Sequence, residues 1–375
     1  MPALFAEEVS RMDNTQNYSG ETEVFLCPNC GSAMSWDAVT QKFRCPSCGT
    51  ETDDAEGDGI VSELPFTPFL IEKAKRFWGE GRVVLHCQSC GAEISVAPTA
   101  TSVECSYCGS PHVLTERQAA GLPPEGVLPF SVDERGAKSI FARWIGKRFW
   151  APKALKRLYQ ESKMHAVYAP YWTYDSDTDS QWHAQGGKVY YVTVGSGKNR
   201  HRERRVRWYP IRGRWKRSFD DVLINADRAR SVLFKKIENY DTRAVRPYAP
   251  AYLSGVGAQH YTVMPDEGFE QAKGEMHAII EQEIKRSILR QYDEVSGLSA
   301  TTSFFNVHFK HILVPVWTTG FMYRDRQYGC LINGQSGQIT GEYPKSGAKI
   351  GAAIAIGLIA LAGLAWLIYN SGMVF

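Results

Sequence analysis

The sequence lacks the compact motifs that mark common catalytic sites. No Gly-x-Ser-x-Gly nucleophile elbow, His-Glu-x-x-His pair or Rossmann glycine fingerprint occurs in its 375 residues. Residues 195–198 suggest a phosphate-binding loop, but its first glycine would fall at Val192, and Asn199 follows the lysine where Ser or Thr is needed. We interpret residues 195–198 as a hairpin turn, and we expect a protein that is not an enzyme.

Two further patterns fall short of metal sites. One consists of alternating aspartates: Asp175, Asp177 and Asp179. A calcium loop would require Gly and Glu where Ser180 and Gly186 stand, so a solvated loop is expected. His308 and His311 are three residues apart on a predicted strand and should point to opposite faces, which makes a shared metal difficult. Cys330, in another predicted strand, is interpreted as a small buried hydrophobe.

A basic segment ahead of an apolar run is missing at the start of the sequence. Residues 1–10 contain Glu7 and Glu8 but no Lys or Arg. We therefore expect no secretory signal and a reducing compartment, in which disulfides are uncommon.

Cysteine is present in a repeated pattern. Eight of the nine cysteines form two units of paired Cys-x-x-Cys motifs, with 14 residues between the pairs and a glycine after each pair: Cys27, Cys30, Cys45 and Cys48, then Cys87, Cys90, Cys105 and Cys108. Four thiolates suit tetrahedral Zn²⁺, and glycine permits the positive φ that closes each turn. The spacing predicts two zinc ribbons holding two structural Zn²⁺ ions, with disulfides or a redox role for a single pair as the alternatives.

A long uncharged run ends the sequence. Residues 350–369 read IGAAIAIGLIALAGLAWLIY, and 20 residues of helix span a hydrocarbon layer of about 30 Å. Lys345 and Lys349 precede the run, so the positive-inside rule places the N-terminal region in the cytoplasm. We expect a single-pass, tail-anchored protein of the plasma (inner) membrane, with a buried core helix as the alternative.

Composition divides the rest of the chain into segments. Residues 1–23 are polar and aperiodic and are expected to be disordered. The predicted order is then zinc ribbon 1 at 24–50, an acidic linker with a short helix at 51–83, zinc ribbon 2 at 84–115, an α+β domain at 122–344, and the membrane helix.

The α+β domain is predicted from two periodicities. Ser131 and Glu134 match a capping box before a helix over 132–149, and further helices are expected over 227–239 and 266–293. Short aromatic-rich runs predict antiparallel strands: VYAPYWTY, KVYYVTV, RVRWYPI, HILVPVWTTGFMY and YGCLINGQSGQITGEY. Turns are expected at 324–327 and at Asn333-Gly334.

The basic residues are concentrated in one segment. Residues 198–217 carry 10 Lys plus Arg against one Glu, and Trp208, Tyr209 and Trp215 interleave with the arginines between Arg200 and Arg217. Such a segment fits anionic lipid or nucleic acid, and a solvated hairpin is the plain alternative. We rank the lipid surface above nucleic acid because the membrane anchor brings it close.

The order of these segments resembles a known family. It runs from the zinc ribbons through LPFSVDERGAKSIFARWIGKRFWAPKAL, YAPYWTYDSDT, FDDVLINA and HILVPVWTTGFMYRDRQYGCLINGQSGQITGEYPKS to the membrane helix. The sequence is similar to bacterial membrane-anchored TFIIB-type zinc-ribbon proteins, which are often labelled primosomal protein N′, a helicase. Helicase chemistry needs a phosphate loop that this sequence lacks. The resemblance implies an SPFH or phage-shock-type membrane-associated partner and carries over no catalytic residue.

The charge of the ribbons bears on their function. Ribbon 1 has only Lys42 and Arg44 between its outer cysteines, and ribbon 2 has Glu93 and Glu104 without any Lys or Arg. Such ribbons are poorly matched to phosphates. We expect a non-catalytic membrane-tethered adaptor that binds a cytoplasmic protein; the alternatives are a membrane-associated nucleic-acid-binding protein and an enzyme with an unrecognised site in the α+β domain.

Overall fold

The fold was analysed in a computed structural model of the whole chain. It describes residues 26–32, 34–52, 61–75, 83–87, 93–96, 113–118, 122–152, 164–228, 231–253, 256–323 and 326–370. The predicted disordered segment 1–23, most of the acidic run 51–58 and part of the predicted turn 324–327 lie outside these residues.

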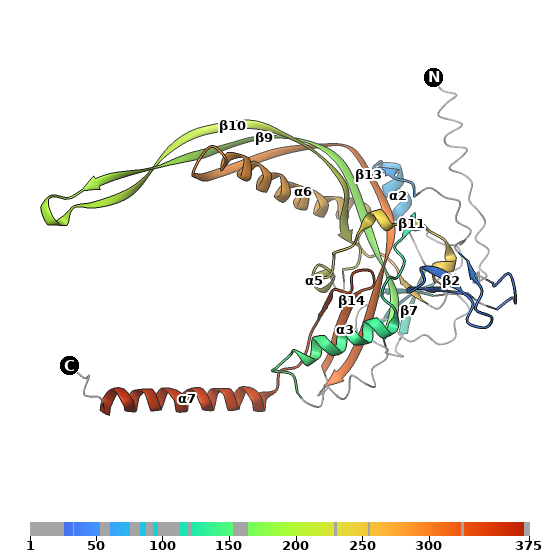
Figure 1. Cartoon of the computed structure of the whole chain (residues 1–375). Helices are drawn as coiled ribbons and strands as arrows, with labels where there is room; N and C mark the ends of the chain where they lie inside the picture. The colour runs from blue at the N-terminus through green and yellow to red at the C-terminus, as the bar shows by residue number, and fades with distance from the viewer. Residues whose placement is uncertain are drawn as a thin grey trace, which may run out of the picture.

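Three long antiparallel strands dominate the architecture (Figure 1). They are β9 (His165–Val194), β10 (His201–Asn225) and β13 (Glu294–Tyr323), and β9 lies between the other two. Aromatic and β-branched residues are frequent in all three, which favours extended backbone. The β9–β10 hairpin arches outward and ends in a narrow tip, so the molecule has a long projecting arm.

Shorter strands extend the sheet at its base. The order is β11-β8-β13-β9-β12-β6-β5-β7, and β14, β15 and β4 add to the β13 side. Their bounds are β4 (Leu64–Pro65), β5 (Val83–Cys87), β6 (Glu93–Val96), β7 (Val113–Gln118), β8 (Gly126–Val127), β11 (Arg246–Pro247), β12 (Gly257–Gln259), β14 (Arg326–Asn333) and β15 (Ile339–Gly341). The predicted α+β class is confirmed, with a strongly curved sheet.

Helix α6 (Pro265–Ile288) lies under the arch formed by β9, β10 and β13 (Figure 1). Its buried residues recur every four positions and form a single stripe: Ala272, Met276, Ile280, Ile284 and Ile288. This stripe packs in one core cluster with Trp172 and Tyr174 of β9. The amphipathic pattern predicted over 266–293 therefore covers the concave face of the sheet.

A second helix covers the base of the sheet. Helix α3 (Glu134–Gly146) buries Phe141, Trp144 and Ile145. Its N-cap is Asp133, whose carboxylate accepts a hydrogen bond from the Gly136 N–H at 2.8 Å. The predicted capping box at Ser131 is wrong, because an aspartate two residues later satisfies the free N–H groups of the first turn.

Two predictions in the middle of the chain are wrong. The aspartate run from Asp175 to Asp179 lies inside β9 and forms no loop, because cross-strand partners such as Arg214 and Ser218 bind the carboxylates. The helix predicted over 227–239 is reduced to α5 (Ser231–Phe234), since β10 continues to Asn225. The hairpin turn at 195–198 is confirmed: Gly195 and Gly197 have φ of 92° and 59°, and the 3-10 helix η1 (Gly197–Asn199) follows.

The segment predicted as a linker belongs partly to the body. Strand β4 pairs with β13, and helix α2 (Pro68–Lys75) buries Leu70 and Ala74 in the same cluster as Trp172. The Tyr261 hydroxyl joins these parts, because it donates to the Ala74 carbonyl at 2.8 Å and accepts from the Leu122 N–H at 2.6 Å. Residues 61–75 are therefore fixed to the α+β body by both strand pairing and side-chain burial.

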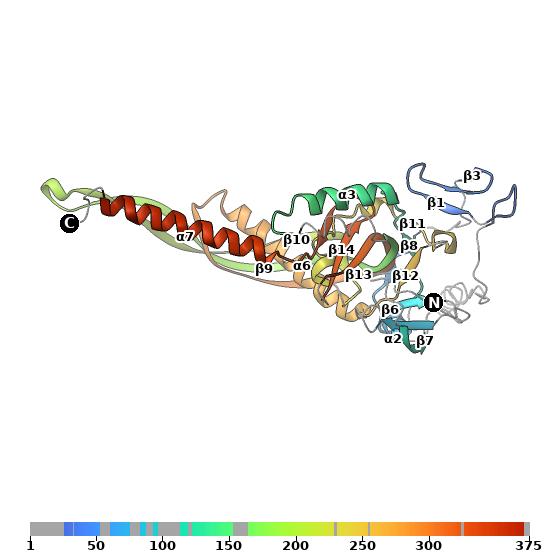
Figure 2. The same cartoon turned by 90° about the horizontal axis from the view of Figure 1, so that it is seen from below.

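Helix α7 (Gly347–Asn370) extends away from the body on the same side as the β9–β10 hairpin (Figures 1 and 2). Its first turn is fastened to the body, since the Lys349 ammonium donates to the carbonyls of Phe149 and Ala151 at 2.6 and 2.7 Å. Among the residues that the structure describes, none of the helices is long and apolar enough to cross a membrane. The helix predicted over 350–369 is present as α7. Its crossing of a membrane stays a prediction.

Two glycines of α6 test how tightly the helix fits the sheet. A Cβ added to Gly268 would lie 2.4 Å from the Tyr174 hydroxyl, whereas one added to Gly274 would meet no atom within 4 Å. We expect Gly268→Ala to lower the free energy of unfolding by about 1–3 kcal/mol through overpacking. Gly274→Ala should raise it by about 0.5–1 kcal/mol, because alanine favours helix. Urea unfolding of both variants measures this; equal effects would contradict the packing.

A buried histidine predicts a pH dependence of stability. Burial and the neighbouring His260 lower the pKa of His311 to about 3, so the folded state keeps this imidazole neutral. The unfolded chain takes up the proton near pH 6.5, and stability should therefore fall as the pH drops below 6.5, by about 2 kcal/mol at pH 5. His311→Gln should flatten this slope in denaturant titrations between pH 5 and 7.5. The control is His183→Gln on the exposed part of β9, which should leave it unchanged.

Candidate metal centre and basic hairpin

Two backbone turns bring the first four cysteines together. In each turn the glycine N–H donates to the carbonyl of the first cysteine, Gly31 to Cys27 at 2.9 Å and Gly49 to Cys45 at 3.0 Å. Both glycines are left-handed, with φ of 71° and 76°. The predicted role of glycine is confirmed for both pairs of this first unit, because an L side chain is strained at this φ.

The four sulfurs converge on one point. Cys27 and Cys48 have their Sγ atoms 3.5 Å apart, as do Cys30 and Cys45, and all four sulfurs lie within 4.8 Å of one another. A tetrahedral ion with Zn–S distances of 2.3 Å requires sulfurs about 3.8 Å apart. The donor set and spacing therefore fit a tetrahedral thiolate metal, and these four residues could hold one metal ion.

Local hydrogen bonds favour the thiolate form of Cys48. The Thr50 hydroxyl lies 3.1 Å from the Cys48 sulfur, and together with the Thr50 N–H it lowers the pKa of Cys48 to about 6. Cys27 and Cys45 are buried, whereas Cys30 and Cys48 are exposed. Each turn thus supplies one buried and one exposed cysteine. Four protein ligands would fill all four coordination positions of a tetrahedral ion, which is the arrangement of a structural site.

Ribbon 1 is formed by three short strands, β1 (Ser35–Asp37), β2 (Lys42–Arg44) and β3 (Glu51–Thr52). It packs on the body instead of standing apart: Phe43 is fully buried, and its ring lies 5.0 Å from that of Tyr252. The Phe130 carbonyl accepts from both the Trp36 indole N–H at 3.0 Å and the Gln41 side-chain amide at 2.9 Å. Metal ligation and body packing therefore share one small core.

The second predicted ribbon is only partly described. Cys90, Cys105 and Cys108 lie outside the described residues, and Cys87 is placed only as the last residue of β5. The neighbouring strand β6 pairs with β12, so the backbone of this region continues the main sheet. Zinc binding by the second unit remains a prediction.

An acidic group that we did not predict lies where β4 meets the long strands. Glu63, Asp175 and Asp220 have oxygens within 4.8 Å of one another. Burial and a hydrogen bond to Glu63 raise the pKa of Asp175 to about 7. The buried Lys310 ammonium supplies a countercharge, 2.7 Å from Asp221 and 3.3 Å from Glu63. The group is thus an ion-pair network, and the sequence pattern missed it because its members come from four distant segments.

The basic segment forms the outer half of the β9–β10 hairpin. Strand β13 begins at Glu294, opposite Gly187, so the hairpin continues beyond this point as a free two-stranded ribbon. Part of its charge is neutralised within the protein by five ion pairs: Arg204–Glu294, Arg205–Glu203, Arg214–Asp179, Lys216–Asp179 and Arg217–Glu283. Four arginines of the segment make no ion pair with another described residue: Arg200, Arg202, Arg207 and Arg212. The positive surface is therefore smaller than the sequence alone indicated.

Aromatic side chains on and next to the free part of the hairpin face water. Tyr190, Tyr191, Trp208 and Tyr209 are between 38% and 58% exposed. Guanidinium groups lie over two of these rings, Arg207 at 5.4 Å from Tyr190 and Arg202 at 5.3 Å from Tyr191. Such mixed aromatic and cationic surfaces suit the boundary between lipid headgroups and water. Trp215, by contrast, turns inward, and its indole N–H donates to Glu283 of α6 at 3.1 Å.

Comparison with known proteins gives little functional information. No family model matches the chain, and no solved structure matches it. The chain is similar to an uncharacterized protein, YdjG, of Bacillus subtilis (strain 168), with 26% identity over 243 residues that cover 64% of this chain and 69% of that protein. Membership of the zinc-ribbon family therefore stays a prediction.

The four-cysteine site predicts a change in metal content. We expect Cys45→Ser to remove one equivalent of zinc from the purified full chain, because the remaining three thiolates cannot close the tetrahedral site. Cys330→Ala is the matched control, since this cysteine is buried in β14 and does not belong to the group of four converging sulfurs. Mass-spectrometric metal analysis measures both; equal zinc in Cys45→Ser and in the unchanged protein would contradict the assignment.

Proposed function

We propose that the protein is a non-catalytic, membrane-tethered zinc-ribbon adaptor that binds a cytoplasmic protein at the inner face of the membrane. The observation that carries the proposal is the pairing of a closed four-thiolate centre with an exposed apolar helix at the other end of the chain. A closed centre offers no position for substrate, which favours a structural role. An SPFH or phage-shock-type membrane-associated protein is the partner class that we propose.

The side chains of α7 support an anchoring role. Large apolar residues are exposed all around it: Ile350, Ile354, Ile356, Leu358, Ile359, Leu361, Leu364, Trp366 and Leu367. An apolar surface of this extent is not stable in water and marks contact with lipid or protein. We propose that the lipid bilayer covers it, as a single-pass anchor that leaves the rest of the described chain in the cytoplasm.

The basic hairpin supports a second contact with the membrane. Its unpaired arginines can reach anionic headgroups, and each basic group near such a surface contributes about 1 kcal/mol. The hairpin and α7 leave the body on the same side, and the tip of the hairpin reaches beyond the end of the helix (Figures 1 and 2). A bilayer crossed by α7 in this placement would also enclose the arginines, which is costly. We therefore propose that α7 changes its direction relative to the hairpin when it inserts, which requires release of the hydrogen bonds that join Ser346 and Lys349 to the body.

Adaptor function predicts a zinc-dependent partner. We expect the full chain, crosslinked in its native cells and purified in detergent, to retain one specific cytoplasmic protein. Cys45→Ser should lose this protein, because the ribbon surface depends on the metal. Cys330→Ala controls for a general effect of cysteine loss. Repeated purification without a specific partner would overturn the proposal.

Lipid binding can be tested with charge-matched variants. In flotation, the ratio of binding to vesicles with 30% phosphatidylserine over binding to vesicles without it removes the contribution of α7. This ratio should decrease about tenfold or more for the triple variant Arg202→Gln, Arg207→Gln and Arg212→Gln, because these groups make no ion pair with another described residue. The control loses the same charge from paired positions: Arg204→Gln, Arg205→Gln and Arg214→Gln. The control should bind more strongly than the first triple variant. Equal loss in both would indicate a diffuse charge effect, and preferred binding of single-stranded DNA over vesicles would favour the nucleic-acid alternative.

A further inference from the structure

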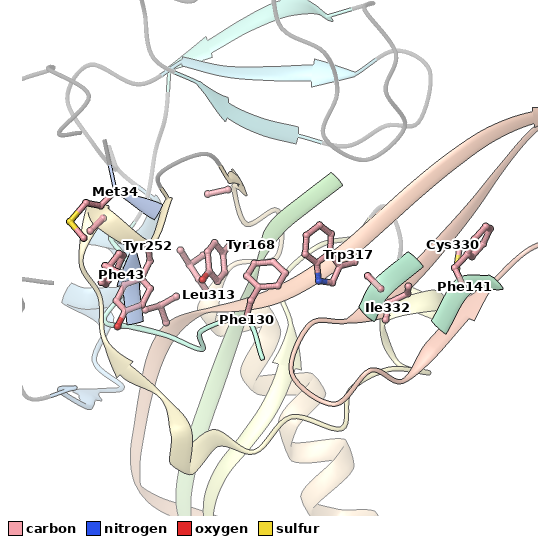
Figure 3. Close-up of a cluster of buried hydrophobic side chains, with 14 of the residues drawn as sticks. Met34, Phe43, Phe130, Phe141, Tyr168, Tyr252, Leu313, Trp317, Cys330 and Ile332 are labelled. Atoms are coloured by element: carbon pink, nitrogen blue, oxygen red, sulfur yellow. The ribbon is translucent and has the colours of Figure 1, made fainter. Parts of the chain in front are cut away.

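A cavity lies where ribbon 1 meets the α+β body. It has a volume of about 390 Å³, and its lining combines β1 and β2 of the ribbon with residues of β9, β13 and the start of α3. Four aromatic side chains form much of its wall: Trp36, Tyr168, Tyr252 and Trp317. Figure 3 shows Tyr252, Tyr168, Phe130 and Trp317 along one row of the buried cluster. The cavity is therefore an aromatic one that exists only while the ribbon is docked.

The polar edges of both tryptophans in this wall are already bound. Trp36 donates its indole N–H to the Phe130 carbonyl at 3.0 Å, and Trp317 donates to the Val132 carbonyl at 2.8 Å. The rings are thus held in place, and they offer a ligand only their faces. Trp36 already receives one cation on its face, since the Arg246 guanidinium lies 5.0 Å from the ring. Electron-rich aromatic faces of this kind attract cations.

The charged groups around the cavity are mainly acidic. Asp37, Asp133 and Glu134 line it together with a single cation, Arg44. Arg44 lies 3.7 Å from Asp37 and is half-exposed, and Glu134 pairs at 2.5 Å with Lys138, one turn further along α3. Asp133 caps α3 and makes no ion pair with another described residue. Its carboxylate is therefore the lining charge that is open to a positively charged ligand.

A buried hydroxyl gives independent support for a ligand. Tyr168 is fully buried in the wall, and its Oη has no hydrogen-bond partner among the described residues. A buried hydroxyl without a partner is uncommon in folded proteins, because its desolvation is not compensated. Burial also raises its pKa, so the group stays protonated and neutral. The oxygen has almost no accessible surface, so a polar ligand could give this hydroxyl its missing partner once the wall of the cavity moves to admit it.

We propose that this cavity binds an arginine or lysine side chain from an extended segment of the protein partner. Carboxylates and aromatic faces recognise the cation, and the aliphatic stem of the side chain fits the apolar wall. The inference rests on the proposed adaptor function and names the chemistry of its partner. Metal binding would then contribute to ligand binding as well as to folding, because the ribbon that it stabilises supplies Trp36, Asp37 and Arg44 to the cavity.

Synthetic peptides test the proposal. The zinc-loaded full chain in detergent is titrated with fluorescent nine-residue Gly-Ser peptides that carry arginine, lysine, citrulline or glutamate at the centre. We expect the arginine and lysine peptides to bind at least tenfold more tightly than the neutral citrulline peptide, which has nearly the same shape as arginine. Equal binding of arginine and citrulline, or no binding of any peptide, would overturn the proposal.

Matched variants locate the binding. The double variant Asp37→Asn and Asp133→Asn removes two charges but keeps the acceptors for the N–H groups of Val39 and Gly136. It should weaken arginine-peptide binding at least tenfold. The control Asp241→Asn, which caps the 3-10 helix η2 (Thr242–Ala244), should not. Tyr168→Phe should weaken binding while leaving the melting temperature unchanged or higher. Normal peptide binding by the double variant would overturn the location.

The outcomes separate this inference from the adaptor function. Retention of a specific protein partner that is unchanged in the double variant would overturn the cavity inference and leave the adaptor function intact. Cation-dependent peptide binding without a protein partner in cells would support the cavity and overturn the adaptor function. Loss of both signals would overturn both.

Discussion

The pairing of β9 with β13 is the constraint on which the rest of the structure depends. Its register runs from Gly187 opposite Glu294 to His165 opposite Thr318, with irregularities near Ser296 and Phe305. Side chains alternate between the faces of β9, so Trp172 and Tyr174 enter the core under α6, whereas the alternate positions Val167, Ala169 and Tyr171 enter the core beside α5. A slip of one residue would send each set to the opposite face.

The sequence predicted the elements of this fold better than their extents. The stripe from Ala272 to Ile288 determines α6 because it repeats at helical spacing. The aspartates of β9 concealed the strand, because polar alternation in a solvated strand resembles a loop until its cross-strand partners are known. Asp179 is held by Arg214, which is 35 residues away in sequence. Such distant pairings leave no local signal, and the same reason hid the acidic network around Lys310.

The candidate metal centre shows the opposite case. Its four ligands and both glycines could be predicted from spacing alone, since each turn spans only five residues and is closed by its own backbone hydrogen bonds. What spacing did not reveal is the docking of the ribbon, which depends on Trp36, Phe43 and Gln41 meeting Phe130 and residues still further along the chain. A metal that binds only the folded ribbon also stabilises whatever the ribbon packs against. Metal occupancy of the ribbon and the stability of the α+β body are thus thermodynamically linked.

The free end of the β9–β10 hairpin has a consequence for how copies of the protein behave toward one another. Past Val189, whose N–H is bound by the Asp293 carboxylate, neither strand of the hairpin pairs with a further described strand at its outer edge. Such edges serve in other proteins as templates for intermolecular sheet formation. Arginines occupy these edges, so two approaching hairpins repel each other electrostatically. Salt or polyanions weaken that repulsion. The charge that we assign to membrane contact therefore also opposes sheet formation between the hairpins of two copies. The solubility of the protein should depend most strongly on ionic strength when lipid is absent.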